Sequence, residues 1–176
     1  MDAIVKNLNF GEEARVNVFQ GIEKLTKAVS STLGAGGQCV IMEDDNGNPL
    51  ITKDGVTVAD NITLLDPVEN MGARLLKEAA RKTVKEAADG TTTATVLAHA
   101  ILIEAYKVIK SESPRAIKEG INLAVKKVVQ YLEKCSSPVE GDKIKQVATI
   151  SANNDHEIGM LIDTAFKMVD NTGVVI

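Results

Sequence analysis

Residues that could bind a phosphate group are concentrated where the sequence predicts the start of a helix, in the run Asp89-Gly90-Thr91-Thr92-Thr93. Gly90 interrupts a preceding helical pattern, and apolar residues recur at helical spacing after the threonines. The first turn of a helix has unpaired backbone N–H groups and a partial positive charge, so it can hold a phosphate. The threonine hydroxyls would add donors, and Asp89 could hold a Mg²⁺ ion that bridges to the phosphate. The run therefore fits a metal–nucleotide site.

The same run has a purely structural interpretation. Asp89 could be the N-cap of an ordinary helix, with the threonine hydroxyls satisfying the remaining backbone donors of the first turn. The local spacing of these residues leaves both interpretations open.

A second candidate for phosphate binding is the glycine-rich segment at residues 32–40, where Gly34, Gly36 and Gly37 free the backbone to turn tightly. Backbone N–H groups in such a loop can surround a phosphate. The segment is not a Walker loop, because no Gly-Lys-Ser/Thr follows, and Cys39 stands where a dinucleotide-binding motif requires its last glycine. A simple helix terminator leading into a hairpin is the alternative.

The elements that must position these residues are mainly helices. Helical spacing of apolar residues predicts helices over residues 12–33, 67–88, 91–109, 114–135, 143–150 and 156–169. Segments 39–42 and 50–52 flank a turn with Asn-Gly at its centre and predict a small β-hairpin. Lys53 and Asp54 follow it at a strand end, where functional groups are often displayed, although a solvated turn is the alternative. Residues 56–63 could form a short helix or a strand, and further short strands are possible at 3–8 and 173–176. His99 is expected to be packed rather than to bind a metal.

Composition restricts the class of protein. Of the 176 residues 44% are apolar but only 3% are aromatic, which favours closely packed helices over a β-sandwich. A net charge of -4 with scattered Lys and Arg argues against nucleic-acid binding. Cys39 and Cys135 lie far apart in sequence, so a disulfide scaffold is not expected. Without a signal-peptide pattern or a membrane-spanning run, we expect a cytoplasmic protein that does not contact membranes.

Five motifs, taken in order from about residue 10 to the end, resemble the N-terminal part of the GroEL-type group I chaperonins, the 60 kDa chaperonin family. The matching stretches are Thr32-Leu33-Gly34, Ile51-Thr52-Lys53-Asp54-Gly55-Val56, Glu69-Asn70-Met71-Gly72-Ala73, the run from Asp89 to Ala98, and Thr149-Ile150-Ser151-Ala152-Asn153. The resemblance implies a mainly α fold, a helical equatorial ATP-binding domain with a small β-hairpin. Residues 1–135 would form the N-terminal half of that domain, and residues 136–176 the incomplete first segment of the intermediate domain.

The resemblance also implies roles for individual residues toward ATP, Mg²⁺ and a bound K⁺. Asp89 matches the Mg²⁺ ligand, Lys53 lies near the phosphates and the K⁺, and Asp54, the catalytic candidate, lies beside the γ-phosphate. The residues matching the nucleotide-binding positions of the family are Thr32, Leu33, Gly34, Ala35, Lys53, Asp89, Gly90, Thr91, Thr92 and Thr93.

The sequence departs from the family pattern at two places. Where the family has Thr-Leu-Gly-Pro-Lys-Gly-Arg-Asn, this chain has Ala35, Gly36, Gln38 and Cys39 in place of Pro, Lys, Arg and Asn. Ala88 stands where the family has a glycine before the Asp-Gly-Thr motif. The loop therefore lacks two positive charges and a rigid turn residue.

The resemblance implies that this chain is part of an ATP-dependent chaperonin subunit that assists the folding of other proteins. Expected partners are further copies of the subunit in a ring, a GroES-type co-chaperonin, and unfolded polypeptides bound through an apical domain beyond these residues. By itself the chain is expected to hydrolyse ATP poorly, because the later equatorial half would supply the principal catalytic aspartate. A divergent, non-hydrolysing paralogue with a structural or interaction role is the alternative, and a small phosphotransferase is a weaker one.

Overall fold

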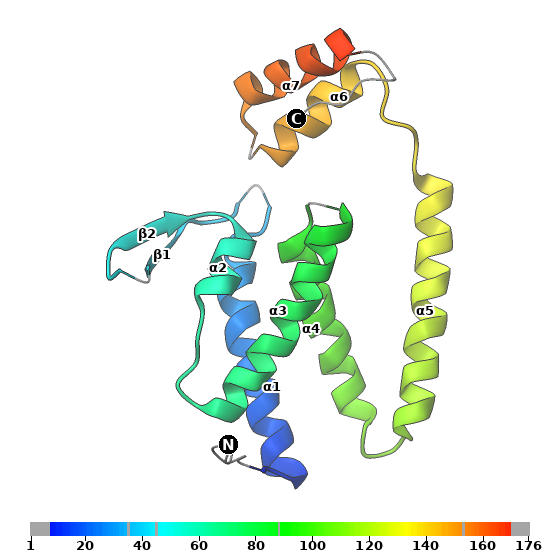
Figure 1. The fold of residues 1–176 in the computed structure, drawn as a ribbon. Coiled ribbons are helices and arrows are strands. Elements are labelled where there is room, and N and C mark those ends of the chain that lie inside the picture. The colour runs from blue at the N-terminus through cyan, green and yellow to red at the C-terminus, as the bar shows by residue number, and fades with distance from the viewer. Residues whose placement is uncertain (1–7, 35, 45, 88, 153, 170–176) are drawn as a thin grey trace, which may run out of the picture. The chain divides into compact units, whose positions relative to one another are not determined.

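A computed structural model describes residues 8–34, 36–44, 46–87, 89–152 and 154–169 (Figure 1). Ala35, Ala88, the possible strand at 173–176 and all but the last residue of the possible strand at 3–8 lie outside these ranges. The chain divides into two compact units, Met1–Ile117 and Lys118–Ile176, which we describe separately. The division falls within a helix, and the domain boundary expected after residue 135 stays a prediction.

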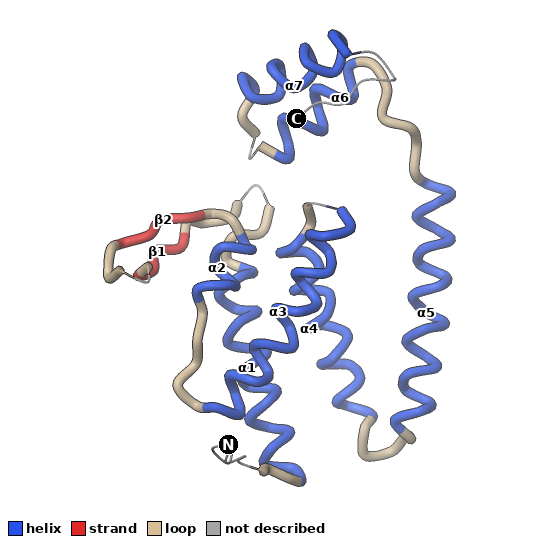
Figure 2. The backbone as a smooth tube through the Cα atoms, in the orientation of Figure 1, coloured by secondary structure: helices blue, strands red, loops and turns tan. Residues whose placement is uncertain are grey.

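The described chain is mainly helical with one small antiparallel hairpin, which confirms the predicted fold class (Figure 2). The segment after Asp54, for which the sequence left helix and strand open, is a helix. In chain order the elements are α1 (Gly11–Ser30), β1 (Val40–Glu43), β2 (Pro49–Thr52), α2 (Gly55–Asn61), α3 (Pro67–Ala87), α4 (Thr91–Val108), α5 (Pro114–Cys135), α6 (Asp142–Ser151) and α7 (His156–Val169).

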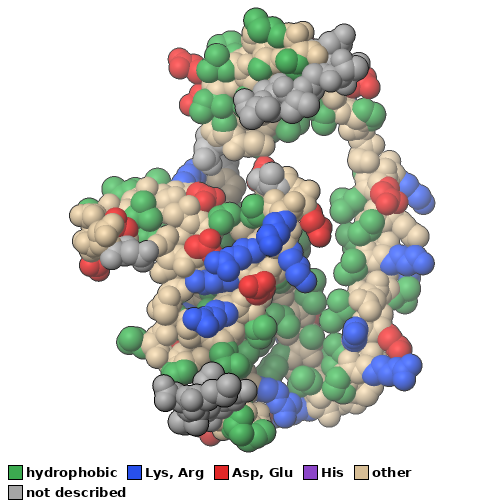
Figure 3. Space-filling model, in the orientation of Figure 1, with side chains coloured by type: hydrophobic (Ala, Val, Ile, Leu, Met, Phe, Trp, Pro, Cys, Tyr) green, Lys and Arg blue, Asp and Glu red, His purple; other side chains and the backbone are tan. Residues whose placement is uncertain are grey.

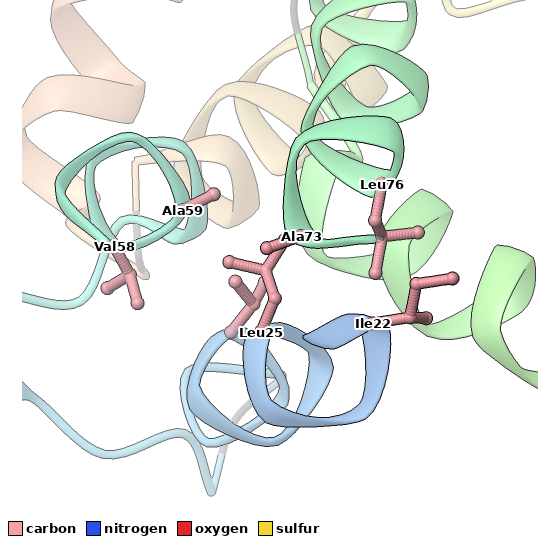
Figure 4. Packing of buried hydrophobic residues seen from close by; sticks show 7 residues of the cluster. Ile22, Leu25, Val58, Ala59, Ala73 and Leu76 are labelled. Carbon is pink, nitrogen blue, oxygen red and sulfur yellow. The ribbon is translucent and has the colours of Figure 1, made fainter. Parts of the chain in front are cut away.

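The core of the first unit lies between α1, α2 and α3 (Figure 4). Leu25 and Val29 of α1 and Val58 of α2 have no solvent-accessible surface. The other buried members of this cluster are Ile22, Ala59, Ala73 and Leu76. Burial of Val29 fixes the C-terminal end of α1, and therefore the point at which the glycine-rich segment begins.

Two glycines allow α1 and α3 to cross closely. A Cβ atom at Gly21 would overlap the backbone carbonyl oxygen of Glu69, and one at Gly72 would overlap the carbonyl oxygen of Val18. Each helix therefore packs against the backbone of the other at a position without a side chain. The ion pair between Lys24 and Glu69 joins the same two helices, but its Lys side chain is exposed and such pairs contribute little.

Basic side chains of α3 gather on one face of the first unit (Figure 3), and two of them hold the C-terminal end of α2. Lys77 Nζ donates to the carbonyl oxygens of Ile62 at 2.6 Å and Asp60 at 3.1 Å. Arg81 Nη2 lies 2.8 Å from Asp60 Oδ1. Partial burial lowers the pKa of Lys77, although the nearby Asp60 opposes the shift. These contacts tie α2, which follows Asp54, to the α3 surface.

The hairpin of β1 and β2 pairs Val40 with Thr52 and Ile41 with Ile51. Asp44 holds its turn, because Asp44 Oδ1 accepts hydrogen bonds from the backbone N–H groups of Asn46 at 2.9 Å and Asn48 at 2.8 Å. The hydrogen bond from the Asn48 backbone is the main reason that the pKa of Asp44 is lowered. The hairpin thus has a fixed strand register and leads the chain to the start of α2.

In the second unit α6 and α7 pack side by side. Gly159 allows the close approach, since a Cβ atom there would overlap Thr149 Oγ1. A cavity of about 980 Å³ adjoins both helices, and its walls are mostly apolar side chains such as Ile144, Ile162 and Phe166. None of the residues that the sequence singled out for phosphate binding lines it. In the part of the chain that the structure describes, no helix is both long enough and apolar enough to cross a membrane.

Candidate phosphate-binding site

The start of α4 has no side-chain cap at its N-cap position. Gly90 is the N-cap residue, with a left-handed backbone (φ 82°, ψ 15°), so the interpretation of Asp89 as the N-cap is wrong. Asp89 Oδ1 instead accepts a hydrogen bond from the Gly90 backbone N–H at 2.6 Å. Its side chain is exposed, one residue outside the helix. No side chain at the N-cap position occupies the first-turn N–H groups of α4, which are the groups that an anion site uses.

The threonines of this turn face different surroundings. Thr91 is buried and its carbonyl oxygen accepts a hydrogen bond from Thr95 Oγ1 at 2.9 Å, whereas Thr93 is exposed. Thr92 is half-buried and is the one that meets another segment of the chain. The sequence treated the three hydroxyls alike, but the structure singles out Thr92.

The glycine-rich segment after α1 is closed by its own backbone. Gln38 N donates to the Ser31 carbonyl oxygen at 2.8 Å, and Gly37 N donates to that of Gly34 at 3.0 Å. Gly34 has a φ of 70°, which favours glycine. Gly34 and the preceding Leu33 are exposed at the tip of this loop, and Ala35, also expected to bind nucleotide, lies outside the described residues. The loop is therefore a tight turn whose tip faces solvent.

The glycine-rich loop and the start of α4 meet through two hydroxyl groups. Thr32 Oγ1 lies 3.4 Å from Thr92 Oγ1, although 60 residues separate them. Thr32 is 6% exposed, and its hydroxyl donates its only proton to the Val29 carbonyl oxygen at 2.8 Å. Thr92 is therefore the donor in the contact between the two threonines. Both candidate phosphate-binding segments consequently adjoin the same point.

A third segment reaches this point at the start of α2. Gly55 is buried, and a Cβ atom added there would overlap Thr92 Oγ1. Because Asp54 directly precedes Gly55, the strand end that the sequence marked as a display position lies beside the first turn of α4. Sequence reasoning named Gly55 only as part of a motif, because its burial against Thr92 is visible only in the structure.

Asp54 is the N-cap of α2 rather than a residue of a solvated turn. Asp54 Oδ2 accepts from the Thr57 backbone N–H at 2.9 Å and from Thr57 Oγ1 at 2.6 Å, and Oδ1 accepts from Val56 N at 3.3 Å. Burial raises the pKa of Asp54, but the hydrogen bonds from Thr57 and Val56 together outweigh it, so the pKa is lowered. The carboxylate is thus ionised at neutral pH. Oδ1, with one long hydrogen bond, keeps capacity for a further ligand.

Charged groups at the site are few. Lys53 is half-buried, and within the described residues it has no ion-pair partner. No group of three or more His, Cys, Asp or Glu side chains in the described ranges could hold a metal ion. Mg²⁺ usually takes one or two carboxylates and completes its shell with phosphate oxygens and water. The two carboxylates of these segments, Asp54 and Asp89, are too few for a metal cage made by the described residues alone.

His99 of α4 has the packed role expected for it. Its ring lies against Phe19 of α1, with a centroid distance of 6.0 Å and an interplanar angle of 40°. Its Nε2 atom is buried without a hydrogen-bond partner among the described residues. Phe19 also stacks on Tyr106, at a centroid distance of 5.2 Å, so these rings join α1 to α4.

Comparison with known proteins gives consistent matches. A model of the TCP-1/cpn60 chaperonin family matches residues 25–174. Two crystal structures of the chaperonin gp146 from the bacteriophage EL 2 (Pseudomonas aeruginosa), both obtained in the presence of ATP-BeFx, match with a TM-score of 0.79. Their sequence identities are 30% and 31%, and each match covers 93% of this chain and 29% of the gp146 chain. The chain thus spans less than a third of the length of these solved proteins.

Proposed function

We propose that this chain, which belongs to the TCP-1/cpn60 chaperonin family, forms the phosphate-binding part of an ATP site. The site would belong to a group I chaperonin subunit that assists protein folding. The observation that carries the proposal is the contact of Thr32 with Thr92, with Gly55 against the same hydroxyl. A glycine-rich turn, an uncapped helix start and an ionised carboxylate on a third segment adjoin one another. This combination suits a polyphosphate with a divalent cation.

We assign the residues as follows. The backbone N–H groups of residues 91–93 and of the loop around Gly34 would bind phosphate oxygens. Asp89 would hold Mg²⁺, which when bound neutralises phosphate charge. Lys53 would contribute the only basic side chain among residues 31–38, 52–55 and 89–93, close to a K⁺ ion. Asp54 would orient the attacking water beside the γ-phosphate, since phosphoryl transfer depends on positioning rather than on a covalent nucleophile.

The wider role follows from the family and extends beyond the residues of this chain. The proposed subunit assembles with copies of itself into a ring in the cytoplasm. It would bind a GroES-type co-chaperonin and unfolded polypeptides through an apical domain. Turnover of ATP would also need the second half of an equatorial domain, so residues 1–176 by themselves would turn over ATP slowly or not at all.

A divergent paralogue that does not hydrolyse ATP is a second candidate. Two observations favour it: the glycine-rich loop carries no basic side chain, and Asp54 already accepts three hydrogen bonds at the start of α2. In such a protein the same three segments would serve only as a scaffold for interaction with other subunits.

The proposal is tested by Mg-ATP binding and turnover in the full-length protein and in Asp89→Ala. We expect Asp89→Ala to raise the Kd for Mg-ATP at least tenfold and to reduce the dependence of binding on Mg²⁺. The control is Asp66→Ala, because Asp66 Oδ1 accepts from Val68 N and Glu69 N at the start of α3, away from the site. Asp66→Ala should cost about 1 kcal/mol of stability and leave the Kd unchanged.

Three outcomes separate the candidates. Binding with turnover that is lost in Asp89→Ala supports the chaperonin ATPase. Binding without turnover favours the non-hydrolysing paralogue. A wild-type protein that binds no Mg-ATP, or an Asp89→Ala variant equal to wild type in binding and turnover, contradicts the proposed metal role.

A further inference from the structure

We propose that Gly55 is a positioning residue for the nucleotide site: its missing side chain lets the start of α2 close against the first turn of α4, so that Asp54 and Thr92 face one ligand. This inference rests on the proposed function, because it concerns the same site. It assigns to Gly55 a specific role, that of setting the spacing between two of the three segments.

Gly55 occupies a place where no side chain fits. A Cβ atom there would overlap Thr92 Oγ1 and lie 3.3 Å from Thr92 Cβ and 3.4 Å from Val29 Cγ1. Val29 has no accessible surface, since it belongs to the buried core between α1, α2 and α3. The side chain of Val29 therefore cannot retreat, and the strain would fall on Thr92 or on α2.

The backbone at Gly55 does not itself require glycine. Gly55 is the first residue of α2, and its φ lies outside the positive range in which glycine is preferred. Helix propensity does not favour glycine over alanine either. The close approach to Thr92 is then the physical reason for glycine at this position.

A side chain at position 55 would separate the two halves of the site. Asp54 caps α2 through Thr57, so the carboxylate moves together with α2 if this helix is displaced. If the first turn of α4 is displaced instead, the contact of Thr92 with Thr32 in the glycine-rich loop is lost. Either displacement of the backbone separates Asp54, the loop and the first turn of α4.

The experiment compares Gly55→Ala with Gly120→Ala in the full-length protein, using Mg-ATP as the probe in isothermal titration. Gly120 lies on α5, outside the three segments of the site, its φ is not positive, and a Cβ atom there would meet nothing within 4 Å. We expect Gly55→Ala to raise the Kd at least tenfold and Gly120→Ala to change it less than twofold.

A conservative second change provides a rescue. In Gly55→Ala/Thr92→Ser, the serine keeps the hydroxyl, but without the γ-methyl group it can rotate that hydroxyl away from the new Cβ atom. We expect this double variant to recover at least half of the lost affinity on a logarithmic scale. Destabilisation that arises elsewhere than at the overlap with Thr92 would not be repaired in this way, because Thr92→Ser removes apolar contacts without adding any.

Thermal unfolding keeps the inference testable if Gly55→Ala folds poorly. Gly55→Ala should lower the Tm in the wild-type background and leave it unchanged in a Thr92→Ala background, since the overlapping atom is then gone. Equal losses of Tm in both backgrounds would overturn the inference.

If wild type binds Mg-ATP and Gly55→Ala binds equally well, the inference fails while the proposed function stands. A wild-type protein without Mg-ATP binding would overturn both.

Discussion

Asp54 offers a test that separates a structural role from a chemical one at a single residue. Asp54 caps α2 through hydrogen bonds from Thr57 and Val56, and it is also the carboxylate that we assign to the water beside the γ-phosphate. Asn is as good an N-cap as Asp, whereas Ala cannot cap. Asp54→Asn therefore removes the charge alone, whereas Asp54→Ala removes both the charge and the cap.

The expected magnitudes follow from the contacts. Asp54→Ala leaves two backbone N–H groups and the Thr57 hydroxyl without their acceptor, so we expect a loss of about 1 to 2 kcal/mol in the free energy of unfolding. In Asp54→Asn the amide oxygen can still accept from Thr57, and only the 3.3 Å bond from Val56 N is lost. That loss should be about 0.5 kcal/mol.

The pH dependence of stability gives an internal check. The pKa of Asp54 in the folded protein is below its ordinary value of 3.8, so the unfolded chain takes up the proton more readily. The stabilisation that the charge of Asp54 contributes is fully present when the pH is above the ordinary pKa of 3.8. It is lost as the pH falls through the pKa of the folded state. The difference in stability between wild type and Asp54→Ala should therefore be constant above about pH 5 and become smaller below the ordinary value.

Urea unfolding from pH 3 to pH 7 and steady-state ATP turnover measure the two roles. We expect Asp54→Asn to keep most of the stability and to reduce turnover about a hundredfold or more, because the amide would no longer orient the attacking water as the carboxylate does. Asp54→Asn with wild-type turnover would refute the chemical role. A difference between wild type and Asp54→Ala that grows as the pH falls would refute the reasoning about the pKa.

Two further predictions concern the core that supports the site. Gly72→Ala should destabilise the first unit by about 2 to 4 kcal/mol in urea unfolding, because its Cβ atom would overlap the backbone of α1. The control is Gly120→Ala on α5, which has open space around it and should be neutral or stabilising by up to about 1 kcal/mol. Leu25→Ala should cost about 2 to 5 kcal/mol in the same assay, because Leu25 is fully buried and its removal leaves a cavity. A loss below 1 kcal/mol for Leu25→Ala would contradict the assigned core.

The sequence predicted the helices well because their apolar residues recur with clear helical spacing. The helix predicted over 156–169 has the bounds of α7, and the hairpin forms around Asn46 and Gly47 as expected. The short helix α2 was left undecided, since seven residues are too few to establish a helical period.

The site was only partly predictable from the sequence. Its segments could be named from their residue types, but local patterns carry no information about which segments adjoin. The contact between Thr32 and Thr92 depends on how α1 and α4 pack against each other, and the role of Gly55 depends on that contact in turn. The N-cap position was also misplaced by one residue, because Asp89 and Gly90 are both common at helix starts and only the backbone conformation distinguishes them.

The junction of Thr32, Gly55 and Thr92 has a thermodynamic consequence for the whole first unit. Its three segments are brought together only when α1, α2 and α4 have assembled, so no isolated helix or loop offers the ligand the same surroundings. A nucleotide that occupies this junction binds the folded state and not the unfolded chain, and at a hundred times its Kd such a ligand stabilises a protein by about 2.7 kcal/mol. A nucleotide bound at this junction would therefore also make local unfolding rarer at the far ends of α1, α2 and α4, which do not contact the phosphates.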